Sequence, residues 1–567
     1  MCKIKPESGL EKPPKTEEND ESTEDSEDES ENFQDDAESS DEMSEIEETR
    51  PLTTAKIKKI DVMLLMFIVK SYQPVTIVEQ EGLKRLTTAM HAGYVMPKRK
   101  DITKRILPEM YNKSMNELKI IVKEQVETIC LSVELWESGF YQDSVVGITG
   151  HFITPDYEFK SVLLKVHYCE HFSEDLKAVL TKICDEWEIS GKINCGVTDY
   201  GSDGLQAVNS LGWNHISCTG YKLKHTLLMS LKKCNILSIV QNIMHYFETN
   251  LKAVQMLEEY QTKAGIAEPM ELLYYEESIW ISKYDMVERF VSLREPILAV
   301  LAEQKDVSLP KVTNKNWSEL EWFCKLLKPF REATKELIED KYLAASKVIP
   351  IVNRLNNAVQ DARKQPDCYN LFKDMIEQLE CELNYRFKSI ESNSNFALCT
   401  ILDPRYKLSM FLDENIVNLT KLNLVSEVEQ LMKIDTNVTN PSKMDGEPRT
   451  ANIEDRCEDN LTMSHSLAQK EVESYLQEEI IDGDPYKWWQ CNKSKYPHVA
   501  KLFKTRCNIV ATSVTGEHLF TELGMHLNNR RDMLSYRHAE MIVFLNANLN
   551  DDDYLRLMPD NYHNTLS

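Results

Sequence analysis

The sequence predicts a chain of mixed class, in which an α/β sheet is interrupted by a long all-α block. Residues 128–235 alternate short strand-like runs with helical runs, and residues 236 to about 475 show almost only the periodicity of amphipathic helices. The 567 residues suffice for two to four domains, and a hydrophobic content of 42% is ordinary for a globular core.

Residues 1–52 are predicted to form a disordered acidic tail, because they hold almost no aromatic or branched apolar side chains. Positions 1–50 carry 20 acidic and 5 basic residues, a net of −15, so the remaining 517 residues carry only −11 of the total −26. Two interpretations stay open for this tail. It is either an arm that competes with DNA or recruits basic partners such as histones, or a solubilising segment.

Membrane proteins, secreted proteins and zinc fingers are not indicated. The longest apolar run, "VMLLMFIV", falls far short of the ~20 residues of a membrane helix, and the first residues lack the apolar stretch of a signal peptide. The 14 cysteines form no CxxC pair and no CxxC…HxxxH spacing. We therefore expect an intracellular soluble protein with reduced, mostly buried thiols.

Residues 53–118 are predicted to be an N-terminal helical domain with a basic cluster where a loop meets a helix. Such a cluster can neutralise DNA phosphates, has the composition of a nuclear-localisation signal, or simply forms a solvated surface. Its members are Lys98, Arg99, Lys100, Lys104 and Arg105.

Residues 119–235 are predicted to form the first part of a ribonuclease-H-like core. The strand-like runs "CLSVELW", "SVVGITGHFI" and "FKSVLLKVHY" precede the helical run "EDLKAVLTKICDEWEI". The strand "INCGVTD", which ends in Asp199, and a further helix follow. This order of three strands, helix, strand and helix is typical of ribonuclease-H-like sheets.

The first of these strands carries an acid, Glu134, among apolar residues. A buried carboxylate loses hydration worth several kcal/mol unless it is paired or binds a metal, so its presence raises the question of a functional site. Alternatively, Glu134 lies on the solvent face of the strand. Side chains of a strand alternate between its two faces, so Glu134 points to the same side as Ser132 and away from the side of Leu131 and Val133.

The remaining residues are predicted to complete the fold. Residues 236–470 form a helical insertion with a polar, disordered loop at 435–465, residues 471–550 return to the sheet, and residues 551–567 form a tail.

At this point the chain resembles the hAT transposase superfamily, especially host proteins derived from it that often carry BED zinc fingers. The motifs run in order through residues 60–549: "QPVTIVEQEGLKRL", "SVELW", "GVTDYGSDGLQAV", "ESIWISKYDMVERF", "KLLKPFREATKEL", "ALCTILDPRYKL", "DPYKWW" and "ATSVTGEHLFTELGMHLNNRRDMLSYRHAEMIVFLN". The last string resembles the family's C-terminal dimerisation segment. The chain has only Cys2 before residue 130, so the ligands of a BED finger are not found there.

The resemblance implies a site in which two Asp and one Glu hold two Mg²⁺ or Mn²⁺ ions for strand cleavage and transfer. The family's positions fall on Glu134, Asp199 and Glu517, so Glu replaces the first Asp. The longer side chain moves the carboxylate by roughly 1.5 Å, and a ~1 Å misplacement can cost about a hundredfold in rate. We therefore expect impaired catalysis, with no cofactor unless this relic site still binds Mg²⁺ or Mn²⁺.

Further positions depart from the family pattern. Asp203 replaces an Asn, Tyr221 replaces the His of a C-x-x-H motif, Ile279 replaces an Arg, and His518 replaces the Arg after the final Glu. The family's tryptophan, which helps manage the DNA ends, is kept as Trp280. His225 could partly replace the lost His, or is simply a helix-surface residue.

Three functions remain open. The preferred one is a host-adopted, catalytically inactive hAT derivative that acts in the nucleus as a dimer bound weakly to DNA or chromatin, in transcription regulation. An active DNA transposase and a protein-interaction scaffold without DNA binding are the alternatives. The dimer is predicted to form through the helix "LSYRHAEMIVFLNANL", for which a buried core helix is the competing interpretation. The predicted contact residues are Ala539, Ile542, Val543, Leu545 and Asn546.

Overall fold

The computed structural model describes most of the chain, all within the compact unit Pro51–Ser567. The described residues are 52–137, 144–169, 176–199, 201–276, 279–303, 309–339, 345–439, 453–513 and 536–550. The predicted acidic tail, apart from its last residue, and the predicted tail 551–567 lie outside them, as does Glu517. The predicted domain boundaries remain predictions.

The centre of the described unit is a five-stranded mixed sheet with the order β3-β2-β1-β4-β5. β1 pairs antiparallel with β2, β2 pairs antiparallel with β3, and β4 runs parallel to both β1 and β5. The expected order of three strands, helix, strand and helix is confirmed. The elements are β1 (Ile129–Glu137), β2 (Ser144–Ile153), β3 (Phe159–Cys169), α5 (Leu176–Glu186), β4 (Ile193–Thr198), α6 (Gly201–Ser210), β5 (Asn214–Ser217) and α7 (Thr219–Leu231).

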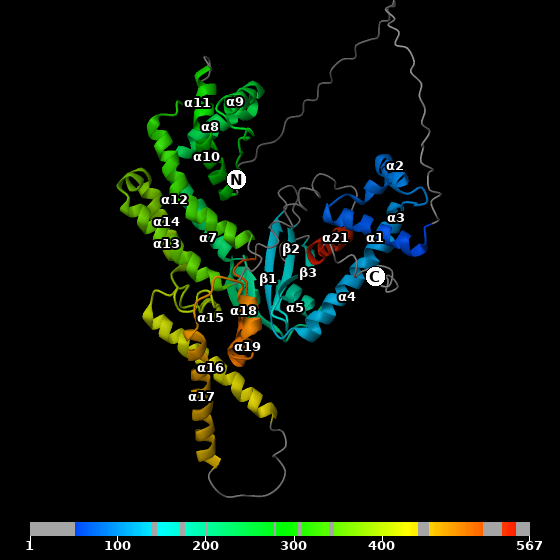
Figure 1. Cartoon of the computed structure of the whole chain (residues 1–567), viewed down its shortest axis with the longest axis vertical. Coiled ribbons are helices and arrows are strands. Elements are labelled where there is room, and N and C mark those ends of the chain that lie inside the picture. Colours follow the sequence, from blue (N-terminus) through cyan, green and yellow to red (C-terminus); the bar gives the residue numbers. More distant parts are fainter. Residues whose placement is uncertain are drawn as a thin grey trace, which may run out of the picture. The chain divides into compact units, whose positions relative to one another are not determined.

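Helices cover both faces of this sheet, so its strands are apolar on both sides. Leu131 and Val133 face a core shared with the N-terminal helices and the last helix, whereas Cys130 and Val197 face the core of the helical block. In Figure 1, α4 and α21 lie beside β3, and α7 and α19 lie on the other side of the strands.

The N-terminal segment is helical, as predicted. Its elements are α1 (Thr54–Lys70), η1 (Val75–Glu79), α2 (Glu81–Met90), α3 (Arg99–Asp101), η2 (Ile102–Ile106) and α4 (Leu107–Gln125). The wider π turn of η2 precedes Pro108, which lacks an N–H and whose ring would clash with the carbonyl of a regular α turn.

The described residues between 236 and 506 are mainly helical, as predicted. The helices are α8 (Ile236–Thr249), α9 (Leu251–Lys263), α10 (Trp280–Ser292), α11 (Arg294–Glu303), α12 (Asn314–Glu339), η3 (Ala345–Lys347), α13 (Val348–Lys364), α14 (Pro366–Phe387), α15 (Ser394–Leu402), α16 (Glu414–Thr439), α17 (Ile453–Gln477), α18 (Pro485–Asn492) and α19 (Pro497–Arg506).

The loop predicted to be disordered at 435–465 is shorter in the structure than the sequence indicated. α16 continues to Thr439 and α17 begins at Ile453, so helix extends into both ends of the predicted loop. The intervening residues 440–452 lie outside the described part.

The last helix, α21 (Tyr536–Asn548), returns to the sheet and packs on β3, α4 and α1. The Asn546 side-chain amide donates to the Val69 carbonyl at 2.8 Å, and the Lys70 ammonium donates to the Asn546 carbonyl at 3.1 Å. A cation at the C-terminal end of a helix also complements the helix dipole. α1 is therefore fixed to the end of α21.

The first prediction concerns Gly196 in β4, which sits directly beneath α6. A Cβ on Gly196 would lie 2.8 Å from Val208 Cγ2. We expect Gly196→Ala to lower the free energy of unfolding by about 1–3 kcal/mol, because the close contact forces α6 to shift. Thermal and denaturant unfolding measure this. Gly82→Ala, where nothing lies within 4 Å, is the control and should unfold no earlier than the wild type. A fully stable Gly196→Ala variant would contradict the packing described.

Candidate functional site

Glu134 lies in β1, three residues before that strand ends at Glu137, and Asp199 directly follows the last residue of β4. In the parallel pairing of these strands, Val133 is opposite Thr198. Continuing this register by one residue places Asp199 beside Glu134, and neighbouring strands are about 4.8 Å apart. Extended in this way, the register places two of the three acids predicted from the sequence on adjacent strands, near the carboxyl end of β4.

Glu134 does not face solvent, because only 9% of its surface is exposed. The alternative prediction, that Glu134 lies on a solvent-facing side of the strand, is therefore wrong. The helical block covers the face of the sheet that carries Ser132 and Glu134. Asp199 is half-buried. The pair lies in a covered, polar part of the sheet rather than on an open surface.

The third acid, Glu517, lies outside the described residues, but the segment that leads to it is described. The Cys218 N–H donates to the Thr198 carbonyl, and the Thr219 N–H donates to the Ala511 carbonyl, both at 2.9 Å. Cys218 Sγ is 3.1 Å from Thr512 Oγ1. Residues 511–513 therefore run past the end of β4. Convergence of all three acids remains a prediction.

The acidic pair fits part of a divalent-metal site. Carboxylate oxygens are the ligands that Mg²⁺ and Mn²⁺ prefer, and Glu134 and Asp199 supply them from adjacent strands. Among the described residues, no group of three or more His, Cys, Asp or Glu side chains is arranged to hold a metal ion. Two carboxylates without a third ligand offer an ion few protein contacts.

The predicted basic cluster lies on one solvent-facing turn between α3 and η2. Lys98, Lys100, Lys104 and Arg105 are exposed, and Arg99 is half-buried. The Lys98 N–H donates to the Asp101 carboxylate at 3.0 Å, which starts the helix, and the apolar side of the turn is buried in the core. The cations thus lie on the first turn of a helix, which its capping hydrogen bond and its buried apolar side hold in place.

The cluster belongs to the most basic part of the chain. Residues 53–125 hold 14 Lys and Arg against 7 Asp and Glu, a net of +7. Since residues 51–567 carry −11, residues 126–567 carry −18. The N-terminal helices are therefore a positive region on an otherwise acidic protein.

Two further groups of residues predicted to make external contacts are buried in the structure. Trp280, predicted to contact DNA, is only 3% exposed and begins α10 inside the core of the helical block, so its ring packs against protein. Ala539, Ile542, Val543 and Leu545 are buried in this chain's own core.

Asn546, the fifth residue of the predicted dimer contact, bonds to α1, as described above. The competing interpretation, a core helix, therefore holds for this face of α21. The reason is that the sheet needs an apolar cover on the β3 side, which α21 supplies. A dimer contact requires other residues.

A basic and aromatic surface on α7 was missed in the sequence analysis. The rings of Tyr221 and His225 lie 4.4 Å apart, and Tyr221 is exposed. Burial, and then the nearby Arg386, lower the pKa of His225 below its usual range, so the ring is neutral at physiological pH. The signal was present: residues 204–247 contain no Asp or Glu but four Lys.

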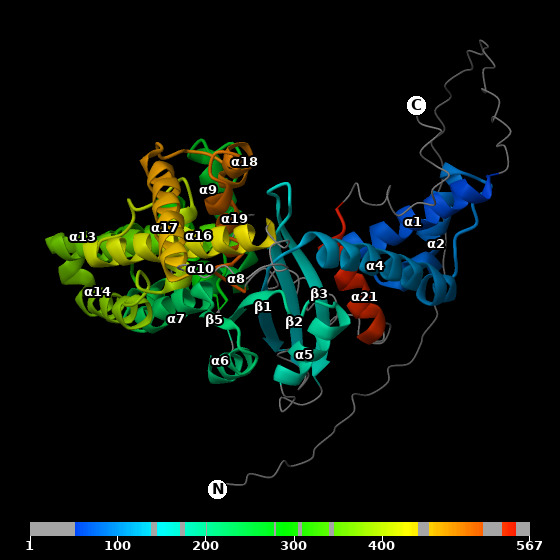
Figure 2. The ribbon, with the colours of Figure 1, turned by 90° about the horizontal axis from the view of Figure 1, so that it is seen from below.

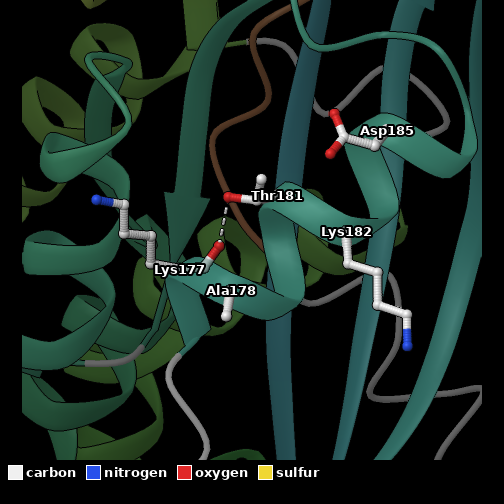
Figure 3. Close-up of a pocket in the computed structure, with 5 residues that line it drawn as sticks. All are labelled: Lys177, Ala178, Thr181, Lys182 and Asp185. Carbon is white, nitrogen blue, oxygen red and sulfur yellow. Dashed lines mark hydrogen bonds between the residues drawn. The ribbon is translucent and has the colours of Figure 1, made fainter.

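A small pocket on α5 offers no comparable site. Its lining residues, Lys177, Ala178, Thr181, Lys182 and Asp185, all come from one helix. In Figure 3 the two lysines point away from each other, and the Thr181 hydroxyl bonds back to the Lys177 carbonyl at 2.8 Å. Hydroxyls that bond within their own helix are common, so we assign no ligand to this pocket.

Other expectations agree with the described residues. Eleven cysteines there are free thiols, and eight of these are buried. None of the helices in the described ranges has the length and hydropathy needed to cross a membrane.

Comparison with known proteins confirms the resemblance. Residues 471–549 match the hAT family C-terminal dimerisation region. The chain is 23% identical over 522 residues to zinc finger BED domain-containing protein 4 of Homo sapiens, covering 87% of this chain and 44% of that protein. It is 21% identical to human zinc finger BED domain-containing protein 6, covering 87% and 55%.

A third relative is the "Putative transcriptional regulator tpeD" of Talaromyces stipitatus, 21% identical over 84% of this chain and 60% of that protein. The chain thus spans about half the length of the curated relatives it matches. Its C-terminal part is of hAT type, and most of its length is homologous to hAT-derived BED zinc-finger proteins.

The second prediction concerns His151, which lies in β2 opposite Cys130 of β1. Both ring nitrogens are hydrogen-bonded, Nε2 with Ser132 Oγ and Nδ1 with Ser161 Oγ, each at 2.8 Å. Burial lowers the pKa of His151 to about 3. The unfolded chain, with an ordinary pKa near ~6.5, therefore binds a proton that the folded chain does not.

Stability should accordingly fall as the pH drops from about 6.5 towards 3, by up to ~1.4 kcal/mol per pH unit from this group. Denaturant unfolding between pH 6.5 and 5 measures the slope. His151→Asn should flatten it by that amount, although it also weakens the fold at pH 7. If wild type and variant lose stability equally with pH, His151 is not the group responsible.

Proposed function

We propose that this protein is a catalytically inactive hAT transposase derivative that acts in the nucleus as a dimer associated with DNA or chromatin, in the control of transcription. The observation that carries the proposal is the acidic pair Glu134 and Asp199 on adjacent strands of a hAT-related chain.

The sheet supports a ribonuclease-H-like core. Its order β3-β2-β1-β4-β5, with three antiparallel strands followed by two parallel ones, is the arrangement expected for that fold. Asp199 follows the carboxyl end of β4 and Glu134 lies on the neighbouring parallel strand, near the edge where α/β sheets present their functional groups. This placement supports the site that the resemblance to the hAT family implies.

The side chain at position 134 argues against catalysis. A Glu reaches about 1.5 Å further than an Asp, and Mg²⁺ demands near-ideal octahedral geometry at 2.0–2.1 Å. Glu134 is also buried, so it cannot swing into open solvent to recover the distance. An ion held by Glu134 and Asp199 would supply Lewis-acid chemistry, but at a displaced position relative to the DNA.

DNA association rests on the N-terminal helices. Their net charge of +7 and the exposed cations of α3 and η2 suit phosphate contacts, which are insensitive to sequence. The expected binding is therefore weak and salt-dependent. Nuclear location and a role in transcription follow the relatives, two of which are named for BED zinc fingers and one for transcriptional regulation.

The third prediction tests DNA binding through the exposed cations. Replacing Lys98, Lys100, Lys104 and Arg105 by Glu should weaken binding to all duplex sequences, because phosphate contacts are lost. The slope of log K against log salt should become shallower by up to about 0.9 per lost contact. Fluorescence anisotropy at several salt concentrations measures both quantities.

Charge reversal of four exposed lysines on other surfaces, Lys252, Lys311, Lys328 and Lys487, is the matched control and should keep the wild-type slope. Equal slopes for the two variants would remove the cluster from the DNA interface. Absence of salt-dependent binding in the wild type would instead favour a protein-interaction scaffold.

The fourth prediction concerns chemistry at the acidic pair. In a cleavage and strand-transfer assay with Mg²⁺ or Mn²⁺, we expect no product above background, because the carboxylate of Glu134 is displaced. The variants Glu134→Gln and Asp199→Asn should behave like the wild type. A product that disappears in both variants would show an active transposase.

A further inference from the structure

The outer face of α16 is mostly neutral. Between Asn415 and Gln430, every exposed residue of this helix is uncharged, and beyond them the half-exposed Lys433 pairs with Glu429 of the same helix at 2.6 Å. The exposed polar residues are Asn415, Asn418, Asn423, Ser426 and Gln430. This is unusual in a chain in which 28% of residues are charged.

Large apolar side chains lie among these neutral residues. Leu419 is 55% exposed, Leu422 63% and Ile434 55%, and Leu412, just before the helix, is 74% exposed. At 100° per residue, Leu422 and Ile434 lie about 60° to either side of Leu419, so the three form one stripe along the helix. The stripe from Leu419 to Ile434 is roughly 22 Å long.

The opposite face of α16 is fixed to the matched dimerisation region. Leu424, Val425 and Val428 are buried in the core, and α16 lies against α17 and α19 (Figure 2). Charged side chains of α16 reach inward across these contacts. Lys421 pairs with Glu473 at 3.3 Å and Glu427 with Arg506 at 2.9 Å.

Asp435 also pairs with Lys501, at 3.3 Å. All three partners, Glu473, Lys501 and Arg506, belong to residues 471–549. These three charges of α16 thus bind the dimerisation region, while the apolar stripe is left outside. The outer face of α16 is therefore a continuation of the surface of that region.

A mostly neutral face also lowers the electrostatic repulsion between two copies of this acidic chain. Two copies of a chain with a net charge of −26 repel each other, so self-association is favoured where the contact carries no like charges. α14 offers no such surface, because its exposed residues include Asp367, Asp374 and Glu377. A two-fold contact brings the same patch together twice, which a neutral stripe permits.

We propose that the stripe formed by Leu412, Leu419, Leu422 and Ile434 on the outer face of α16 is the surface that binds a second copy of this chain. The inference rests on the proposed dimer and names its contact. The apolar face of α21 cannot serve, because it is already buried against β3, α4 and α1. Leu419 and Leu422 form the centre of the contact.

The test uses the full chain and the double variant Leu419→Glu/Leu422→Glu. Both positions are exposed and Glu is a good helix former, so the monomer should fold normally. The matched control is Leu86→Glu/Leu251→Glu, two exposed leucines on α2 and α9. Sedimentation equilibrium over a range of protein concentrations, in high salt and without DNA, gives the dimer dissociation constant.

We expect the wild type and the control to be dimers, and the α16 variant to dissociate at least about a hundredfold more readily with an unchanged melting temperature of the monomer. A variant that dimerises like the wild type would overturn the α16 contact and leave the proposed dimer standing. A wild type that stays monomeric at all concentrations would overturn the dimer itself.

A segment of the same chain could cover the stripe instead of a second copy, and the experiment would then give a different result. If a segment of the same chain covers α16, the variant should melt earlier than the control while its molecular mass stays unchanged. That result would also overturn the proposal.

Discussion

The buried amide of Asn508 joins the C-terminal segment of this protein to three strands of the sheet at once. Its Nδ2 donates to the Thr128 carbonyl at 3.2 Å and to the His151 carbonyl at 3.4 Å, and its Oδ1 accepts from Asn194 Nδ2 at 2.9 Å. Thr128 directly precedes β1, His151 lies near the end of β2 and Asn194 lies near the start of β4. Because Asn508 is fully buried, losing any partner leaves a polar group without water, which costs on the order of 1–3 kcal/mol.

The position of Asn508 sets the course of the residues that follow it. They run beside Cys218 and Thr219, past the end of β4, and so towards the acidic pair. Further along, α21 comes back to cover the sheet on its β3 side. The long helical block can therefore be inserted between β5 and this segment without disturbing the site, because both ends of the block are held at the sheet.

Sequence periodicity was sufficient for most of the fold. β2 was predicted to the residue, and β1, β3 and β4 to within one residue at either end, because both faces of the sheet are covered and the strands read as dense apolar runs bounded by polar turns. The pairing of Glu134 with Asp199 could be predicted only through the family motifs, since nothing local relates residues 65 positions apart.

What the sequence could not decide was which apolar faces are shared between parts of the chain. The apolar pattern of α21 is the same whether the helix covers β3 or contacts a second copy of the chain. A tryptophan such as Trp280 likewise occurs both in protein cores and at DNA interfaces, and the sequence pattern does not distinguish the two. The neutral outer face of α16 was equally hidden, because it depends on which of its side chains turn inward to Glu473 and Arg506.

We propose that this hAT-related chain keeps the position of an acidic site but acts as a dimer that holds DNA without cutting it. Sedimentation velocity of a fluorescently labelled duplex with the full-length protein in Mg²⁺ tests this most directly, since it reports the number of chains per duplex and the length of the DNA together. The account predicts a complex of two chains on one intact duplex, which dissociates at high salt. One chain per duplex, or shortened DNA in the recovered complex, would contradict it.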